Sequence, residues 1–272
     1  MTLLQVEELC FAYPGGVQAL NGVNLSIAAG EGVAIIGRNG SGKTTLVKHF
    51  NGLLQPSAGR VLVNGEPTAG REPAELAPAI GLVFQNPDDQ IFSTRVWDEV
   101  AFGPRNLGCS PEEIDERVQQ ALQLVGLSAA REEHPYDLTI TERKLLCLAS
   151  ILAMRPSVIV LDEPTTAQDQ LGVRQLGAII STLLAEGRTV ISITHDMDFV
   201  AECFARTVVM RQGQVVLDGP TAEVFAQPEV LMTTYVKPPA MSELAREIGA
   251  PASAITVTRM LDWIVGRAHR AS

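Results

Sequence analysis

The chain has 272 residues, 46% of them hydrophobic, which fits one large α/β domain or one domain with a tail. Its 21 Lys and Arg residues against 31 Asp and Glu residues give a net charge of −10, which argues against nucleic acid as the main partner, because phosphate-binding surfaces need a basic stripe. The four cysteines are scattered without a C-x-x-C pair, so we expect neither a zinc site nor a disulfide framework, and a reducing cytoplasm fits.

Secretory and membrane-spanning segments are not expected. The first residues, MTLLQVEELCF, carry acids where a signal peptide would be basic and then apolar. No apolar run approaches the ~20 residues that span a bilayer. Any role at a membrane would therefore be carried out from outside the lipid.

The first part of the chain has strand patterns around one strand–loop–helix unit. Period-two alternation predicts strands at 5–13 and 22–27, split by a Pro-Gly-Gly turn. The apolar run 32–36 ends at a glycine-rich turn, after which residues 45–54 have a helical pattern. Another strand at 60–63 leads into a hairpin-type Asn-Gly-Glu turn. We therefore expect a β-rich layer that wraps this first unit.

Helices and buried strands follow in the second part. Residues 110–126 open with Ser-Pro-Glu-Glu, which supplies an N-cap, a proline at the first helical position and acids in the first turn. Thr139 and Glu142 have the spacing of a capping box, and leucines at helical spacing come after them. Buried-type strands at 158–161 and 189–194, with helices between them, predict a parallel sheet, and a hairpin closes it at 207–210 and 214–217.

The composition changes after residue 218. We expect one α/β domain over 1–218, with a helical subdomain at about 86–155, and a small helical appendage over 219–272. The last part, 236–272, has proline breaks, two helical patterns and no strand pattern.

Residues 37–44 read Gly-Arg-Asn-Gly-Ser-Gly-Lys-Thr and satisfy G-x-x-x-x-G-K-[ST] between a predicted strand and a predicted helix. Glycines let backbone N–H groups converge on an anion, and the helix N-terminus adds partial positive charge. Lys43 is expected to reach the β- and γ-phosphates, and the Thr44 hydroxyl to bind Mg²⁺. A plain glycine turn before a helix is the alternative. The pattern predicts a nucleotide-phosphate site formed by Asn39, Gly40, Ser41, Gly42, Lys43, Thr44 and Thr45.

Asp162 and Glu163 follow directly on the apolar strand 158–161, at the carboxyl end where sites form in α/β sheets. Asp162 is expected to hold Mg²⁺ through water, and Glu163 to polarise the attacking water as general base. A helix N-cap after a strand is the alternative. His195 and Gln85 carry little weight alone, since a surface histidine at a strand end is common.

Taken in order, these residues resemble an ATP-binding cassette (ABC) ATPase over about the first 220 residues. The resemblance is in particular to the ATPase of energy-coupling factor importers, on the segments FAYPGGVQAL, FQNPDDQIFSTRVWDEVAFGPRNLG, LASILAMRP, PTTAQD and KPPAMSELAREIG. It implies a P-loop NTPase fold with a RecA-like parallel-sheet core, an antiparallel β subdomain and an α-helical insertion. It also implies ATP and Mg²⁺ as cofactors.

The resemblance implies partners as well. In that family two ATPases lie under a transmembrane scaffold protein, and a separate small membrane protein captures a vitamin or a transition-metal ion. The chain would then be a peripheral ATPase on the cytoplasmic face of the membrane. The appendage would serve dimerisation, with a ligand-sensing regulatory domain as the alternative, although the segment is short for an independent sensor.

Further roles are carried over to matching positions. Gln85 would touch Mg²⁺ and the attacking water, and His195 would hydrogen-bond the γ-phosphate and Glu163. The segment 86–135 would form a groove for a short helix of the membrane subunit. Core packing is as good an interpretation for each of the three apolar residues near the glutamine, Ile91, Phe92 and Trp97.

The adenine base and the dimer interface have their own candidates. The Tyr13 ring would stack on adenine with Val17 nearby, because an aromatic face suits a flat base, although packing beside Phe11 is the alternative. Asp169 would shape the interface between the two ATPases.

One family motif is altered. The family has a serine and two glycines before LDEP, where the backbone meets the ATP held by the other subunit. Here the positions are Thr139, Ile140, Thr141 and Glu142, so branched Cβ atoms and a carboxylate replace the glycines. Since the residues of the chain's own phosphate site are complete, we expect a heterodimer with one competent and one impaired ATP site.

Two other functions compete with the transport ATPase. A soluble cassette protein acting on ribosomes or DNA is disfavoured by the acidic charge, the single cassette and the absence of a long coiled-coil insertion. A nucleotide-gated module that hardly hydrolyses ATP is suggested by the altered motif but opposed by Glu163 and His195.

Overall fold

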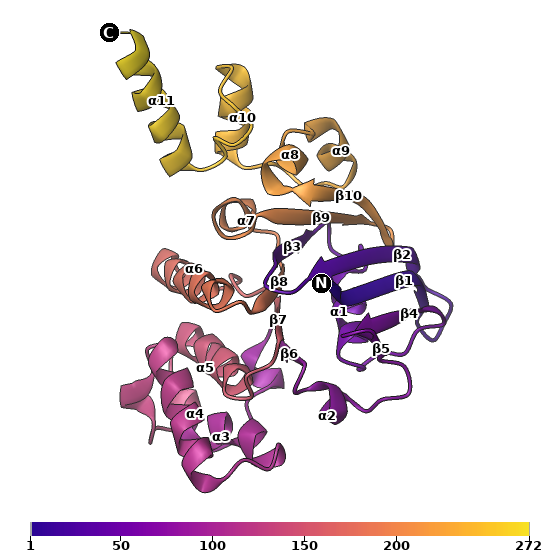
Figure 1. The fold of residues 1–272 in the computed structure, drawn as a ribbon, viewed down its shortest axis with the longest axis vertical. Coiled ribbons are helices and arrows are strands. Elements are labelled where there is room, and N and C mark those ends of the chain that lie inside the picture. Colours follow the sequence, from indigo (N-terminus) through magenta and orange to yellow (C-terminus); the bar gives the residue numbers. More distant parts are fainter. Residues whose placement is uncertain (1, 272) are drawn as a thin grey trace.

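A six-stranded sheet lies at the centre of the computed structural model, which describes residues 2–271 (Figure 1). Its strand order is β10-β9-β3-β8-β7-β6, and all neighbours are parallel except β9 and β10. The parallel strands are apolar and buried, because helices or a second sheet cover both faces. The parallel sheet predicted from the buried-type strands is confirmed, with bounds β3 Gly32–Ile36, β6 Ile80–Val83, β7 Val158–Asp162, β8 Thr189–Ile193, β9 Arg206–Arg211 and β10 Gln214–Pro220.

A four-stranded antiparallel sheet covers one side of this core. Its order is β2-β1-β4-β5, with bounds β1 Thr2–Ala12, β2 Gln18–Ala28, β4 Ala58–Val63 and β5 Glu66–Pro67. Inward-facing residues of both sheets share one apolar cluster with Leu46, Val47 and Phe50 of helix α1 (Lys43–Phe50). The expected β-rich layer around the first strand–loop–helix unit is therefore confirmed. Helix α1 ends earlier than the predicted 45–54, because Gly52 adopts a left-handed φ of 76°.

The helices form two further groups. A helical subdomain at one end of the molecule contains α3 (Val96–Asn106), α4 (Pro111–Leu124) and α5 (Ile140–Leu152) (Figure 1). Two more helices, α6 (Gln170–Ala185) and α7 (Met197–Cys203), pack on the sheet face opposite α1. The short helices are α2 (Pro73–Leu76) and the 3-10 turns Pro87–Asp89, Ser128–Ala130 and Pro135–Asp137.

The C-terminal segment is only partly separate from the domain. It contains α8 (Thr221–Phe225), α9 (Pro228–Thr233), α10 (Ala240–Glu247) and α11 (Val257–Ala271). Phe225 and Leu231 are buried in the main apolar core, whereas α10 and α11 have a small cluster of their own around Ala245, Ala254 and Met260. The small cluster is formed by residues between 241 and 263, and the domain boundary expected at residue 218 stays a prediction. The two helices expected in 236–272 correspond to α10 and α11, which lie at the opposite end of the molecule from α3–α5 (Figure 1).

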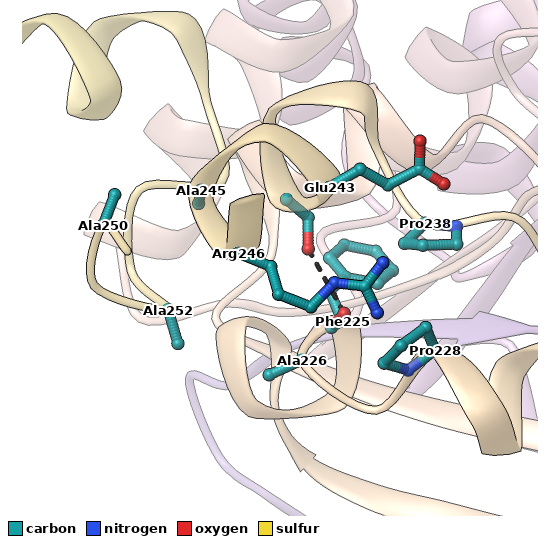
Figure 2. A pocket seen from close by; sticks show the side chains of 10 residues that line it. Phe225, Ala226, Pro228, Pro238, Glu243, Ala245, Arg246, Ala250 and Ala252 are labelled. Carbon is teal, nitrogen blue, oxygen red and sulfur yellow. Dashed lines mark hydrogen bonds between the residues drawn. The ribbon is translucent and has the colours of Figure 1, made fainter. Parts of the chain in front are cut away.

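A hollow of about 170 Å³ lies where α10 meets the α8–α9 turn. Figure 2 shows Arg246 extending over this hollow and Glu243 pointing away from it. The Ser242 hydroxyl donates a hydrogen bond to the Phe225 carbonyl oxygen at 3.2 Å, which joins α10 to α8. None of the helices within residues 2–271 is both long enough and apolar enough to cross a membrane.

Candidate functional site

The glycine-rich loop between β3 and α1 has a shape that only glycine permits. Gly37, Gly40 and Gly42 have φ values of 147°, 78° and 104°. A Cβ atom at Gly42 would lie 2.6 Å from the Ala19 carbonyl oxygen, and one at Gly37 would collide with the Met210 carbonyl oxygen. Side chains are therefore excluded by backbone conformation and by space at once. The loop is held in a curl that turns its backbone toward one point at the start of α1.

The Lys43 side chain bonds back to the backbone of the loop. Its Nζ donates hydrogen bonds to the carbonyl oxygens of Gly37 at 2.7 Å and Arg38 at 3.1 Å. Burial lowers the pKa of Lys43, while the carboxylates of Glu163 and Asp162 act in the opposite direction. The carboxylates favour the charged form of this lysine, and an ammonium at a helix N-terminus is suited to binding an anion such as a phosphate.

Thr44 and Asp162 meet beside this lysine. The Thr44 hydroxyl donates a hydrogen bond to Asp162 Oδ1 at 3.3 Å. Burial raises the pKa of Asp162, opposed mainly by this hydroxyl. Among the side chains that the structure describes, residues 2–267, no three His, Cys, Asp or Glu residues form a metal cluster. The hydroxyl and carboxylate oxygens nevertheless fit Mg²⁺, which takes one or two protein carboxylates and completes its shell with water and substrate phosphates.

Glu163 and His195 form a hydrogen-bonded pair in the same hollow. His195 Nδ1 donates to Glu163 Oε2 at 2.7 Å, and the Glu163 residue is only 7% exposed. The backbone of Glu163 is left-handed, with a φ of 49°. A hydrogen bond from its N–H to the Ile193 carbonyl oxygen, at 2.8 Å, stabilises this conformation. An oriented carboxylate with a histidine partner is the arrangement expected of a general base. The His195 side chain is itself 67% exposed, so it is both a surface histidine at a strand end, as in the alternative interpretation, and the partner of Glu163.

One hollow of about 310 Å³ brings most of the expected site residues together. It is lined by Asn39, Gly40, Gly42, Lys43, Thr44, Thr45, Gln85, Glu163, Thr166 and His195. Gln85, which carried little weight from the sequence alone, thus lies with the phosphate loop. Ser41 is 1% exposed and faces the loop interior, with its backbone N–H donating to the Arg38 carbonyl oxygen.

Tyr13 and Val17 lie beside the hollow but do not line it. The Tyr13 hydroxyl shares a 3.1 Å hydrogen bond with Thr45 Oγ1, and the ring packs edge-on against Phe11 with centroids 4.9 Å apart. Tyr13 is 39% exposed and Val17 66% exposed. The tyrosine therefore both packs on Phe11, as in the alternative interpretation, and leaves part of its ring open beside the phosphate loop.

The altered motif forms a self-contained helix cap. Thr139 is the N-cap of α5 and forms the predicted capping box with Glu142. The Thr139 hydroxyl and backbone N–H donate to Glu142 Oε2 at 2.7 and 2.8 Å. These hydrogen bonds to the carboxylate hold the pKa of Glu142 below its usual value. The residues of the cap do not line the hollow that contains Lys43, and Ile140 is 38% exposed.

Asp169 and Thr141 both lie next to the first turn of α6. Asp169 Oδ1 accepts a hydrogen bond from the Gly172 N–H at 2.8 Å and caps the helix. A Cβ atom at Gly172 would lie 2.9 Å from Thr141 Cγ2, so the threonine methyl packs on this first turn. The branched side chain at 141 is thus directed at the chain's own α6.

The segment after Gln85 contributes an apolar groove of about 360 Å³. Phe92 and Phe102 line it with exposed fractions of 62% and 46%, and their rings pack edge-on at 4.7 Å. Ile91, in contrast, is a buried core residue, and Trp97 is half-buried under the guanidinium groups of three arginines, Arg95, Arg105 and Arg131. Of the three apolar candidates, only Phe92 lies in the groove.

Sequence reasoning missed Lys144 and Thr166. Thr166 lines the hollow, and Lys144 is a buried lysine whose Nζ donates to carbonyl oxygens next to Glu163. A lysine on the apolar face of a predicted helix was the available signal, since buried lysines need partners.

Comparison with known sequences identifies the family to which a chain with this loop and acidic pair is similar. The family model for ABC transporters matches residues 20–166, over half of the chain. The energy-coupling factor transporter ATP-binding protein EcfA of Methanoculleus marisnigri is 45% identical over 249 residues, which cover 91% of this chain and 90% of the relative. An ABC transporter ATP-binding protein of Methanosarcina acetivorans is also 45% identical, but the chain spans only 40% of its length.

Solved structures agree as well. CbiO1 of Clostridium perfringens, described as part of the ABC transporter complex cbiONQ, has a TM-score of 0.77 at 38% identity, covering 90% of this chain and 99% of that one. An ATP-binding cassette solved as a dimer with ADP and phosphate has a TM-score of 0.73 at 27% identity, over 80% of this chain and 99% of that one. With its phosphate loop, its acidic pair at the end of β7 and these relatives, the chain belongs to the family of ABC transporter ATP-binding proteins.

Proposed function

We propose that this chain is the ATP-hydrolysing subunit of an energy-coupling factor type importer for a vitamin or a transition-metal ion. The carrying observation is the 2.7 Å pair of His195 and Glu163 in the hollow that the phosphate loop lines. The EcfA relative, matched along nearly its whole length, supports the importer class.

The residues of the hollow suit ATP hydrolysis. The phosphate-loop backbone and Lys43 would bind the β- and γ-phosphates, and the partly open Tyr13 ring would face adenine. Bound Mg²⁺, held by Thr44, Asp162 and Gln85, would neutralise charge on the phosphates. Glu163 would accept the proton of the attacking water, with His195 orienting its carboxylate and bonding the γ-phosphate.

The altered cap supports an asymmetric dimer. The dimeric structural neighbour with ADP and phosphate makes a two-cassette assembly the expected form. In a head-to-tail pair the start of α5 would face the partner's nucleotide, yet here the Thr139 hydroxyl donates a hydrogen bond to the Glu142 carboxylate. That hydroxyl is then less available to a phosphate, and the Glu142 carboxylate repels one. The competent site would combine this chain's catalytic residues with an unaltered motif from a different ATPase, and Asp169 would lie at their interface.

The groove beside Phe92 and Phe102 supports a membrane partner. It is apolar, open and built on the helical subdomain, as a site for a short amphipathic helix would be. A transmembrane scaffold protein would supply that helix, and a separate membrane protein would capture the substrate. The chain would then lie peripherally on the cytoplasmic face of the membrane.

Replacing Glu163 by Gln tests the function. In the complex purified from host membranes in mild detergent, E163Q should lower ATP turnover at least about 100-fold, because the general base is lost while ATP binding remains. Glu186, an exposed acid at the end of α6, provides the matched control E186Q, which should leave turnover unchanged. Normal turnover in E163Q would refute the proposed catalytic site.

Native mass analysis of the same complex tests the partners. A second, non-identical ATPase together with membrane proteins supports the importer and the heterodimer. A homodimer with membrane proteins contradicts the heterodimer, and a chain without membrane proteins contradicts the transport function.

A further inference from the structure

Lys144 is a buried lysine that forms no ion pair among the residues that the structure describes; burial lowers its pKa, and the nearby charge of Glu163 acts in the opposite direction. It lies on α5 just after the capping box and is 9% exposed. Its Nζ donates to the carbonyl oxygens of Thr166 at 2.5 Å, Glu163 at 3.3 Å and Pro164 at 3.5 Å. An ammonium group has three N–H donors, and this site offers three acceptors.

The three acceptors all belong to the segment that carries the general base. The carbonyl oxygen of Thr166 accepts a hydrogen bond from Lys144. The Glu163 carbonyl oxygen also accepts one from the Thr166 N–H, and the Pro164 carbonyl oxygen also accepts one from Gln168 Nε2. A buried ammonium is costly unless all of its donors are satisfied. The neighbouring buried positions of α5, Leu145 and Leu146, are apolar, so packing alone does not require a cation here.

The segment needs external anchors because its backbone is strained. Glu163 and Ala167 have φ values of 49° and 59°, which non-glycine residues hold only where the surroundings fix them. The Glu163 N–H bonds the Ile193 carbonyl oxygen, and its carboxylate bonds His195. Lys144 holds the third group of the residue, its carbonyl oxygen.

We propose that Lys144 is a positioning residue, which fixes the backbone of Glu163–Thr166 and thereby the direction of the general base. The inference rests on the proposed ATPase function and assigns a role that the phosphate-loop and acidic motifs do not contain. Lys144 also ties this segment to α5, whose first turn would face the partner's nucleotide. Binding of nucleotide at the partner's site would thus change the position of Glu163 through the Lys144 side chain.

Two substitutions in the purified complex test the role. Lys144→Met keeps an unbranched side chain as far as the ε position and removes all three donors, so kcat for ATP should fall about 10-fold or more while KM changes less than about 2-fold. Lys144→Gln keeps two N–H donors and should recover part of the lost kcat. The matched control is Arg143→Met on the same helix, which removes a cation bonded to Asp88 and should leave kcat within about 2-fold.

The outcomes separate this inference from the proposed function. If K144M keeps its kcat, or if R143M lowers kcat equally, Lys144 is not a positioning residue. If K144M does not assemble, hydrogen exchange of residues 163–169 in K144Q decides: faster exchange than in R143M supports the role, and equal exchange overturns it. Wild-type turnover in E163Q, measured alongside, would instead refute the ATPase site itself.

Discussion

At the scale of single residues, the phosphate loop depends on positions where no side chain fits. The left-handed φ values of Gly37 and Gly42 and their contact with neighbouring carbonyl oxygens fix the curl of the loop. The sequence motif already indicated that the loop needs glycine at these positions. The carbonyl oxygens that exclude a side chain come from Ala19 and Met210, which are remote in sequence, and only the tertiary structure identifies them.

Gly37→Ala tests this steric limit. Its Cβ would collide with the backbone oxygen of Met210, which cannot rotate away, so we expect a loss of about 3 kcal/mol or more in the free energy of unfolding and loss of ATP binding. The matched control is Gly65→Ala in the open β4–β5 turn, where φ is 82° and nothing lies within 4 Å. It should cost about 1–2 kcal/mol and leave ATP binding intact. Equal losses in the two variants, measured by denaturant unfolding, would contradict the steric account.

At the scale of elements, α5 is the link between the site and the helical subdomain. Its cap was predictable because a capping box is a local pattern of four residues. Its contacts were not, since they join it to β6, to the first turn of α6 and to the segment after β7. For helix α1 the local pattern was misleading: the apolar pattern continued beyond Phe50, but the left-handed Gly52 ended the helix.

The packing of α5 on β6 gives a stability prediction. A methyl group at Gly81 of β6 would overlap Cγ2 of Ile151 from α5, so Gly81→Ala should destabilise the chain by about 1–3 kcal/mol. The control is Gly219→Ala in β10, where no atom lies within 4 Å and φ is not left-handed, and it should be nearly neutral. Thermal unfolding of both variants provides the measurement. Restoration of stability by the double variant G81A/I151A would show that the overlap is the cause.

At the scale of the whole molecule, the appendage and the helical subdomain lie at opposite ends of the long axis (Figure 1). Membrane docking through the groove and association through α10 and α11 would therefore not compete for the same surface. Helix α11 presents Val257, Leu261 and Ile264 on one face, with exposed fractions of 58%, 55% and 45%. An apolar stripe of this kind supports the proposal that the appendage contributes to association with a second ATP-binding subunit.

Introducing two carboxylates into this apolar stripe tests whether α11 contributes to association of the two ATPases. The double variant L261D/I264D should weaken association of the two ATPases about 10-fold or more, because desolvating a carboxylate in an apolar interface is costly. Arg259→Asp, at an exposed position on the opposite side of α11, should leave association unchanged. Native mass or light scattering over a concentration series measures both. Unchanged association in the double variant would favour a different role for the appendage.

The sequence by itself determined the class of fold and located the glycine-rich loop and the acidic pair of the proposed nucleotide site. Glycines, a lysine and an acidic pair in fixed local order are readable because each motif lies within a few residues on one strand–loop–helix unit. The tertiary structure decided which distant groups meet: His195 with Glu163, Gln85 with the phosphate loop, and Lys144 with the backbone after β7. Such meetings depend on strand order and helix packing, which bring together residues far apart in the chain. The packing of the first part of the C-terminal segment was decided in the same way, because Phe225 and Leu231 are buried in the main core by contacts that no local pattern specifies.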